Sequence, residues 1–254
     1  MAQKSKIFIF SDIDDTLIQT TRKTNMDKKS RIWAVGVDKK PISHMYENIE
    51  KLLRTTMKSK EISIIPTTAR TLESYQRTLF YSDKTLKDNI EFIILNFGGV
   101  VVINNQIDTE WKNIIDDNYK NLKLPIDKVF DDINSILSQK FVKYNLKIRL
   151  LEGFYVDILN KHHRDNIELS TQINQIIENY INDEYYIYKN GSSFAILPNF
   201  LNKKYAVEYL IAKEKPILTI GAGDNKNDLD FMFSTDFLLV PNGSYNAKVL
   251  SKVV

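Results

Sequence analysis

The sequence contains no cysteine, and this absence excludes disulfide bonds and thiol catalysis and fits a reducing compartment. An excess of one charge is also lacking: the formal net charge is +3 and the lysines are scattered, which does not indicate a nucleic-acid partner. No apolar run approaches the roughly 18–20 residues that span a bilayer. The start of the chain shows no apolar signal-peptide core. We therefore expect a cytoplasmic protein without a membrane or nucleic-acid partner.

Apolar residues make up 43% of the 254 residues and charged residues 26%, close to the averages of soluble globular proteins. A chain of this length holds one large domain, or a core domain with a smaller second one. The order of its expected strands and helices favours the second arrangement.

Short continuous apolar runs mark the strands of the expected core. They cover residues 7–10, 62–65, 92–95 and 217–220, and such runs are typical of parallel strands buried on both faces. Helical spacing separates them: residues 72–79 and 204–213 are patterned as helices, as are Met45, Ile49, Leu52 and Leu53. The alternation predicts an α/β fold whose core is a doubly wound, Rossmann-like parallel sheet. Such a sheet binds ligands at the carboxyl ends of its strands.

Two segments interrupt this alternation. A β-hairpin is expected within residues 31–43, and we assign a flap to residues of about 20–43. A longer segment holds helices at 109–122, 125–140 and 165–181, and strands at 146–151, 154–159, 185–189 and 193–197, the last two separated by the Asn190-Gly191 turn. We therefore predict a core made of residues 1–103 and 191–254, and an inserted α+β cap domain made of residues 104–190.

Acidic side chains follow the first and last of the expected core strands. Asp12 and Asp14 come directly after the first strand, and Asp224 and Asp228 come after the last. Carboxylates this close repel one another, and a divalent cation with oxygen ligands is the simplest means of stabilising them. Asp is also favoured in turns and helix caps, but two clusters at one edge of a sheet favour a site.

Hydroxyl and ammonium groups fall beside these acids in the expected fold. Thr67 and Thr68 follow the second core strand, where a hydroxyl and helix amides can hold an anion, and Lys203 begins the helix before the last strand. Carboxylates, a hydroxyl donor, an ammonium and acids for Mg²⁺ are what phosphoryl transfer requires, since most of its catalysis is the positioning and neutralising of negative charge. Thr67 stays an alternative to Thr68, and Lys204 to Lys203.

The order of these motifs closely resembles that of the haloacid dehalogenase superfamily of phosphatases. Asp12-Ile13-Asp14-Asp15-Thr16-Leu17 is similar to D-x-D-G-T-L, Thr68-Ala69-Arg70 to T-G-R, Lys203 to the third-motif lysine, and Gly223-Asp224-Asn225-Lys226-Asn227-Asp228 to G-D-x-x-N-D. The likeness covers residues of about 6–100 and 195–254. The insertion between the second and third motifs resembles the α/β cap of the sucrose-phosphate phosphatase and Cof-like branch.

The resemblance implies a role for each matching residue. Asp12 would be the nucleophile, and Asp14 would protonate the leaving group and then activate water. Thr68 and Lys203 would hold the phosphoryl oxygens, with Asn227 near the phosphate.

The resemblance also implies a Mg²⁺ cofactor, whose protein ligands or supporting acids would be Asp12, Asp14 through its main-chain carbonyl, Asp224 and Asp228. Two positions depart from the family pattern, because Asp15 and Ala69 stand where glycine is usual. Neither departure removes a catalytic group.

These residues predict a Mg²⁺-dependent phosphatase that hydrolyses a small phosphomonoester through an aspartyl-phosphate. The cap is expected to close over the site, exclude bulk water and choose the leaving group. Family resemblance alone favours a sugar phosphate or related metabolite as the substrate. Two alternatives stay open: a phosphomutase that uses the same aspartyl-phosphate, and a catalytically idle binding or regulatory module of the same fold.

Overall fold

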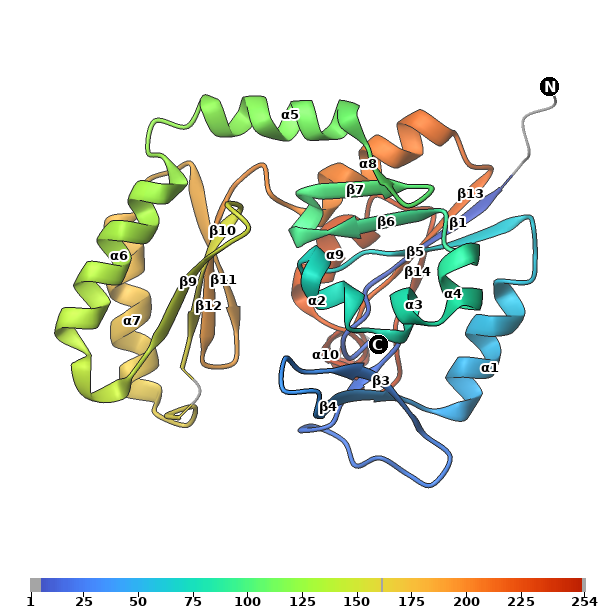
Figure 1. Cartoon of the computed structure of the whole chain (residues 1–254), viewed down its shortest axis with the longest axis horizontal. Helices are drawn as coiled ribbons and strands as arrows, with labels where there is room; N and C mark the ends of the chain where they lie inside the picture. The colour runs from blue at the N-terminus through green and yellow to red at the C-terminus, as the bar shows by residue number, and fades with distance from the viewer. Residues whose placement is uncertain (1–5, 161, 253–254) are drawn as a thin grey trace. The chain divides into compact units, whose positions relative to one another are not determined.

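The structure, a computed structural model, describes residues 6–160 and 162–252, which divide into two compact units (Figure 1). The core unit runs to Lys112 and resumes at Asn202, and the inserted unit runs from Asn113 to Leu201. Both divisions fall later in the chain than the boundaries placed from the sequence. Strand pairing is the reason: β8 (Gln106–Ile107) pairs with β7 (Val100–Ile103) of the core unit, and β12 (Ser193–Pro198) pairs with two strands of the inserted unit.

A parallel sheet with strand order β14-β13-β1-β5 forms the centre of the core unit. Its strands are β1 (Ile7–Ser11), β5 (Ile62–Pro66), β13 (Leu218–Ala222) and β14 (Phe237–Leu239). Ser11 is in register with Pro66 on one side and with Ala222 on the other, so the carboxyl ends of three strands lie level. The predicted α/β fold with a parallel core sheet is confirmed, although the exposed edge strand β14 was not predicted.

The fourth predicted core strand has a different main partner. β6 (Phe92–Leu95) forms an antiparallel sheet with β7 (Val100–Ile103) and β8, and a single parallel bridge, between Thr67 and Ile94, links it toward β5. The chain reverses directly after β6 through η1 (Asn96–Gly98), where all three residues have positive φ. So short a reversal gives an antiparallel partner, because a parallel partner needs a crossover of about a dozen residues or more.

The predicted flap is an antiparallel sheet of order β2-β4-β3, made of β2 (Gln19–Thr20), β3 (Arg31–Val35) and β4 (Pro41–Met45). Trp33 is buried in the main apolar cluster of the core unit and contacts the Phe80 ring edge-on. Met45 also packs in that cluster. The prediction that Met45 belongs to a helix is therefore wrong: it ends β4, and α1 (Glu47–Thr56) begins after it.

Short helices complete the core unit: α2 (Leu72–Gln76), α3 (Leu79–Ser82), α4 (Lys84–Asn89), α8 (Lys203–Glu214), η3 (Lys226–Asp228), α9 (Leu229–Met232) and α10 (Tyr245–Leu250). The helix predicted at 72–79 is interrupted at Thr78, which is extended and whose hydroxyl donates to the Tyr75 carbonyl. α8 begins at Lys203 because the Asn202 side chain accepts the Lys204 amide, as a helix cap does.

The inserted unit is an antiparallel sheet covered on one face by two helices (Figure 1). Its strand order is β11-β12-β10-β9, with β9 (Lys147–Leu151), β10 (Tyr155–Leu159) and β11 (Tyr185–Asn190). α6 (Ile126–Lys140) and α7 (Ile167–Tyr180) pack their apolar faces with the sheet into one cluster. α5 (Thr109–Lys120) begins in the core unit, and η2 (Val142–Tyr144) follows α6. Each strand and helix predicted for this segment is present, within a few residues.

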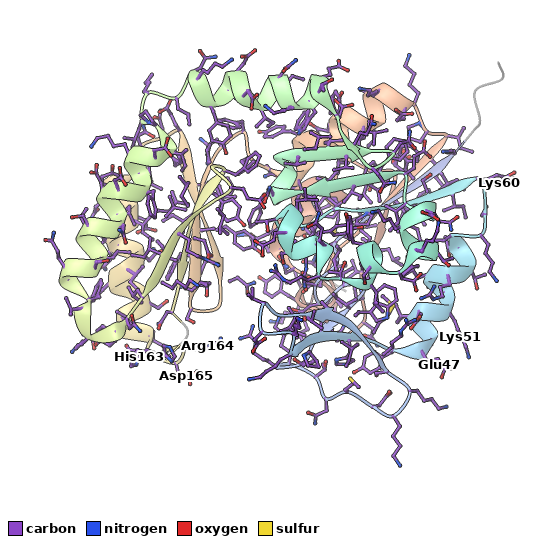
Figure 2. All side chains as sticks on the ribbon, viewed as in Figure 1. Glu47, Lys51, Lys60, His163, Arg164 and Asp165 are labelled. Carbon is purple, nitrogen blue, oxygen red and sulfur yellow. The ribbon has the colours of Figure 1, made fainter. Side chains whose placement is uncertain are left out.

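Charged side chains also lie on the outside of the core unit. Figure 2 shows Glu47 and Lys51 on the outer side of α1, where they form an exposed i,i+4 ion pair. Among the helices of the described residues, none combines the length and the apolar character needed to cross a membrane.

Candidate active site

The site is built where β1, β5 and β13 end. The Asp12 amide, directly after β1, donates to the Ala222 carbonyl over 2.9 Å. The Thr67 amide, directly after β5, donates to the Ser11 carbonyl over 2.7 Å. These bonds extend the sheet ladder past the strands, and the loops that carry the predicted site residues start from the same edge.

Lys203, the first residue of α8, joins two acids from different loops. Its Nζ lies 2.7 Å from Asp12 Oδ1 and 2.8 Å from Asp228 Oδ1, and all three side chains are buried. Gly98 allows α8 to approach: its φ is +98°, and a Cβ there would lie 2.6 Å from the Asn202 carbonyl oxygen. Of the two candidate lysines, the structure brings Lys203 to the acids, whereas Lys204 is half-exposed and lies 3.8 Å from Glu208.

Three acids of the site are placed to share one cation. Carboxylate oxygens of Asp12, Asp224 and Asp228 lie within 4.8 Å of one another. The Thr16 hydroxyl lies between two of them, 3.3 Å from Asp12 Oδ2 and 3.4 Å from Asp224 Oδ1. Buried carboxylate oxygens converging from two loops are a donor set that suits a hard divalent cation such as Mg²⁺.

The electrostatics of the cluster are unbalanced toward negative charge. Burial raises the pKa of Asp12 well above its ordinary value despite the opposing effect of Lys203, and the carboxylates of Asp228 and Asp14 raise it further. Burial and then Asp228 raise the pKa of Asp224 to about 6. Burial alone would lower the pKa of Lys203, but Asp12 and Asp228 outweigh it and raise that pKa. Lys203 therefore keeps its positive charge. It does not offset all of the negative charge of the acids, and a bound cation would offset the remainder.

Asp14 is held apart from this acidic group by Arg70. Arg70 Nε and Nη2 each donate to one Asp14 oxygen over 2.7 Å, a bidentate pair. Arg70 Nη1 also donates to Ser74 Oγ in α2 over 3.2 Å. The Asp14 side chain is therefore held by Arg70 of the second motif and lies outside the group of three acids. Arg70 lies in the T-G-R-like motif, and the sequence alone indicated no role for it.

The two candidate threonines differ in what their hydroxyls do. Thr67 Oγ1 donates to the Ile65 carbonyl over 3.0 Å, which uses its hydrogen within the strand end. Thr68 Oγ1 instead accepts the Arg70 amide over 3.2 Å, which leaves its hydrogen to donate elsewhere. Thr68 is thus the better placed to donate to an anion.

Asn227 is exposed, and its described hydrogen bond runs from its backbone amide to Asn225, so the structure does not bring its side chain to the acids.

Asp15 is accommodated where the family pattern has glycine. Its φ of 63° lies in the left-handed region, which Asp tolerates better than most residues. Its carboxylate accepts the amide and hydroxyl of Thr20 over 3.2 and 2.9 Å and pairs with Lys23. These bonds hold the loop that carries Asp12 and Asp14 to the flap.

A side chain from α10 supports the last acidic loop. The backbone N–H of Asn246 donates to the Asp224 carbonyl over 3.0 Å, and its side-chain Nδ2 donates to the Asn225 carbonyl over 2.8 Å. Within the loop, Asn225 and Asp228 form a reciprocal capping box, and a Cβ on Gly223 would lie 2.4 Å from the Asp228 Cβ. Asn246 lies outside every motif, and sequence reasoning had no signal for it.

A parallel α/β core with these motifs at its carboxyl edge defines a phosphatase of the haloacid dehalogenase superfamily. The sequence model of the Sucrose-6F-phosphate phosphohydrolase family matches residues 5–252, and the chain belongs to this family. It is a hydrolase that acts on phosphoric monoesters. No curated protein sequence matches the chain.

Solved structures share the fold at low sequence identity. Sucrose-phosphatase from Synechocystis sp. PCC6803, in complex with sucrose and phosphate, is 13% identical with a TM-score of 0.54, over 98% of this chain and 97% of that one. The C-terminal domain of C. albicans trehalose-6-phosphate phosphatase is 13% identical with a TM-score of 0.60, over 91% and 74%. Plasmodium falciparum IMP-nucleotidase, bound to IMP, is 14% identical with a TM-score of 0.54, over 99% and 68%.

Proposed function

We propose that this chain is a Mg²⁺-dependent phosphatase that hydrolyses a sugar phosphate through an aspartyl-phosphate on Asp12. One observation carries the proposal: Asp12 is buried 2.7 Å from the Lys203 ammonium, and its carboxylate belongs to a group of three acids whose oxygens lie within 4.8 Å. A nucleophile, a cation that holds it and a site for a metal thus meet at one point.

Asp12, Asp224 and Asp228 would hold Mg²⁺, which when bound supplies positive charge to offset the repulsion between an anionic nucleophile and an anionic phosphate. The Asp12 carboxylate forms a bond to phosphorus while the bond from phosphorus to the leaving oxygen breaks. Lys203 and Thr68 hold phosphoryl oxygens, where negative charge is spread in the transition state. Water then attacks phosphorus, the Asp12–phosphorus bond breaks, and phosphate leaves.

Asp14 would move the proton in both steps. It donates a proton to the leaving alkoxide and then accepts one from the attacking water. Because Arg70 occupies both Asp14 oxygens over 2.7 Å in this structure, a protonated Asp14 requires Arg70 to release at least one of them. Arg70 is therefore proposed to position Asp14 and to govern when it carries the proton.

A sugar phosphate is supported as the substrate by the family to which the chain belongs and by the sucrose and trehalose phosphatases that share its fold. Because a nucleotidase shares the fold, a nucleoside monophosphate is the alternative substrate class that a substrate test should include. No nucleic-acid or membrane partner enters this proposal.

The test measures phosphate release from sucrose 6F-phosphate, trehalose 6-phosphate, IMP and a generic aryl phosphate, with Mg²⁺ present. We expect a sugar phosphate to give the highest kcat/KM and Asp12→Asn to abolish turnover. Asp88→Asn is the matched control, because it makes the same change on an exposed acid of α4. Wild-type turnover by Asp12→Asn would overturn the assignment of the nucleophile, and a preference for IMP would overturn the substrate class.

A second measurement tests the metal without activity. A ligand that binds only the folded state raises the unfolding free energy, so Mg²⁺ is expected to raise the thermal midpoint of the wild-type protein and not that of Asp224→Asn. An equal rise in both proteins would place Mg²⁺ elsewhere.

A further inference from the structure

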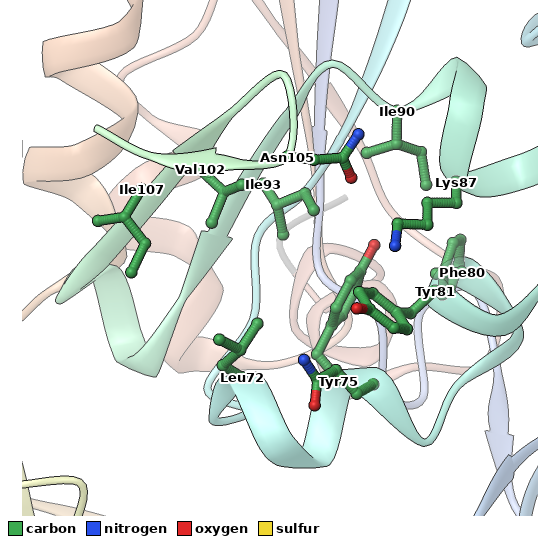
Figure 3. Close-up of a pocket in the computed structure, with 11 residues that line it drawn as sticks. Leu72, Tyr75, Phe80, Tyr81, Lys87, Ile90, Ile93, Val102, Asn105 and Ile107 are labelled. Atoms are coloured by element: carbon green, nitrogen blue, oxygen red, sulfur yellow. The ribbon is translucent and has the colours of Figure 1, made fainter. Parts of the chain in front are cut away.

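The core unit contains a pocket of about 140 Å³ that no residue of the proposed catalytic site lines (Figure 3). It lies among α2, the segment of α3 and α4, and the β6–β8 sheet. Most of its wall is apolar, contributed by Leu72, Phe80, Ile90, Ile93, Val102 and Ile107. An engineered apolar cavity of ~150 Å³ binds benzene, so the space suits a single six-membered ring.

Tyr75 supplies an unused hydrogen-bond donor at this pocket. The side chain is 1% exposed, and its hydroxyl has no hydrogen-bond partner among the described residues. Figure 3 shows this hydroxyl pointing into the pocket from α2. Burial raises the pKa of Tyr75, so the phenol keeps its proton. A buried hydroxyl without a partner is destabilising, and an acceptor on a bound ligand would remove that penalty.

Lys87 supplies a positive charge beside this hydroxyl. Its Nζ lies 3.9 Å from the centre of the Tyr81 ring, and within the described part of the chain it forms no ion pair. Its neighbour on α4, Lys84, behaves differently and pairs with Asp88 over 2.5 Å. In Figure 3 the Lys87 ammonium and the Tyr75 hydroxyl are directed toward the same end of the pocket.

We propose that this pocket binds a small organic monocarboxylate. The apolar body of the ligand, about the size of a benzene ring, fills the space between the aliphatic walls, and its carboxylate pairs with Lys87 and accepts the Tyr75 hydroxyl. Ordered water is the competing occupant, but water needs about two to four polar partners, and most of the wall offers none. A neutral ring would leave Lys87 without a counter-charge.

Titration calorimetry with three probes that share one ring tests the proposal: benzoate, benzyl alcohol and benzylamine. We expect benzoate to bind and the neutral and cationic probes to bind at least about tenfold more weakly, as the loss of a charge-assisted hydrogen bond implies. Lys87→Met should weaken benzoate about tenfold, and Tyr75→Phe about three- to tenfold. Lys84→Met, which removes the same charge from the same helix outside the pocket, should leave the affinity unchanged.

Folding of the variants is checked by urea unfolding. Because the Tyr75 hydroxyl has no hydrogen-bond partner in the described part of the chain, Tyr75→Phe is not expected to lower the stability of the ligand-free protein. A crystal of the wild-type protein soaked with 4-bromobenzoate locates the ring independently of any variant. Failure of benzoate to bind below about 10 mM, equal binding of the three probes, an affinity that Lys87→Met leaves unchanged, or bromine density elsewhere would each overturn the proposal.

Discussion

Lys203 is the residue whose removal tests the electrostatic account of the site most directly. Its ammonium lies 2.7 Å from Asp12 Oδ1 and 2.8 Å from Asp228 Oδ1, and none of these three side chains is more than 9% exposed. Lys203→Met keeps most of the length of the side chain and removes its charge. Removing one partner of a buried ion pair leaves an uncompensated charge and is destabilising by about 3–5 kcal/mol. We expect a loss in this range in metal-free buffer at neutral pH.

Urea unfolding followed by tryptophan fluorescence measures this loss. Both tryptophans, Trp33 and Trp111, are buried in the core unit and report on it alone. Lys204→Met is the matched control, since that lysine is half-exposed and 3.8 Å from its partner, and such pairs contribute about 0–1 kcal/mol.

A second substitution separates charge from packing. Adding Asp12→Asn to Lys203→Met removes one of the two orphaned charges, and we expect it to restore part of the lost stability. If Lys203→Met lowers the unfolding free energy by less than about 1 kcal/mol, or if Asp12→Asn lowers it further, the account of the cluster as one ammonium shared by excess carboxylates is refuted.

Three other perturbations follow from the structure. Arg70→Leu removes the bidentate support of Asp14. We expect kcat/KM to fall by about ten- to hundredfold for an alkyl phosphate. The fall should be much smaller for an aryl phosphate, because its leaving group needs little protonation. Gly98→Ala combines a φ of +98° with a Cβ contact of 2.6 Å, and urea unfolding should show a loss of about 1–3 kcal/mol or more. Burial would raise the pKa of Asp108, but Lys213 and the other groups that donate to it outweigh burial and lower that pKa. The resulting stability is present above the ordinary pKa and is lost as the pH falls through the lowered one, so the wild type should exceed Lys213→Met in stability at neutral pH and converge with it in acid.

Each of these predictions has its own contrary result. Equal losses on both phosphates would show that Arg70 does not act through Asp14. Gly243→Ala is the control for Gly98, because its φ is +78° but no atom of the described residues lies within 4 Å of the added Cβ. An equal loss in both variants would mean that backbone strain, and not the Cβ contact, causes the loss. A stability difference for Lys213→Met that persists below a pH of about 3 would mean that Asp108 is not its source.

Local pattern was enough for much of the architecture. The continuous apolar runs at β1, β5 and β13 predicted buried parallel strands, because only side chains buried on both faces remain apolar without alternation. The inserted unit followed equally well from alternating helices and strands and from the Asn190-Gly191 turn, whose glycine has a φ of 60°. Pairing partners were harder to predict. β6 reads as a core strand by composition, and only the reversal after it gives it an antiparallel neighbour.

The sequence alone determined which acids belong to the site, their order and their place after strands. The reason is that a carboxylate that follows a parallel strand emerges at the ligand-binding edge of the sheet. Which side chains meet was decided by the tertiary structure. Lys203 reaches Asp12 across 191 positions of sequence, and Arg70 draws Asp14 away from the other acids across 56. Asn246 carries no local signal, and neither does Tyr75, whose hydroxyl has no hydrogen-bond partner among the described residues. Their roles depend on distances between elements, and those distances are set by packing, which no motif encodes.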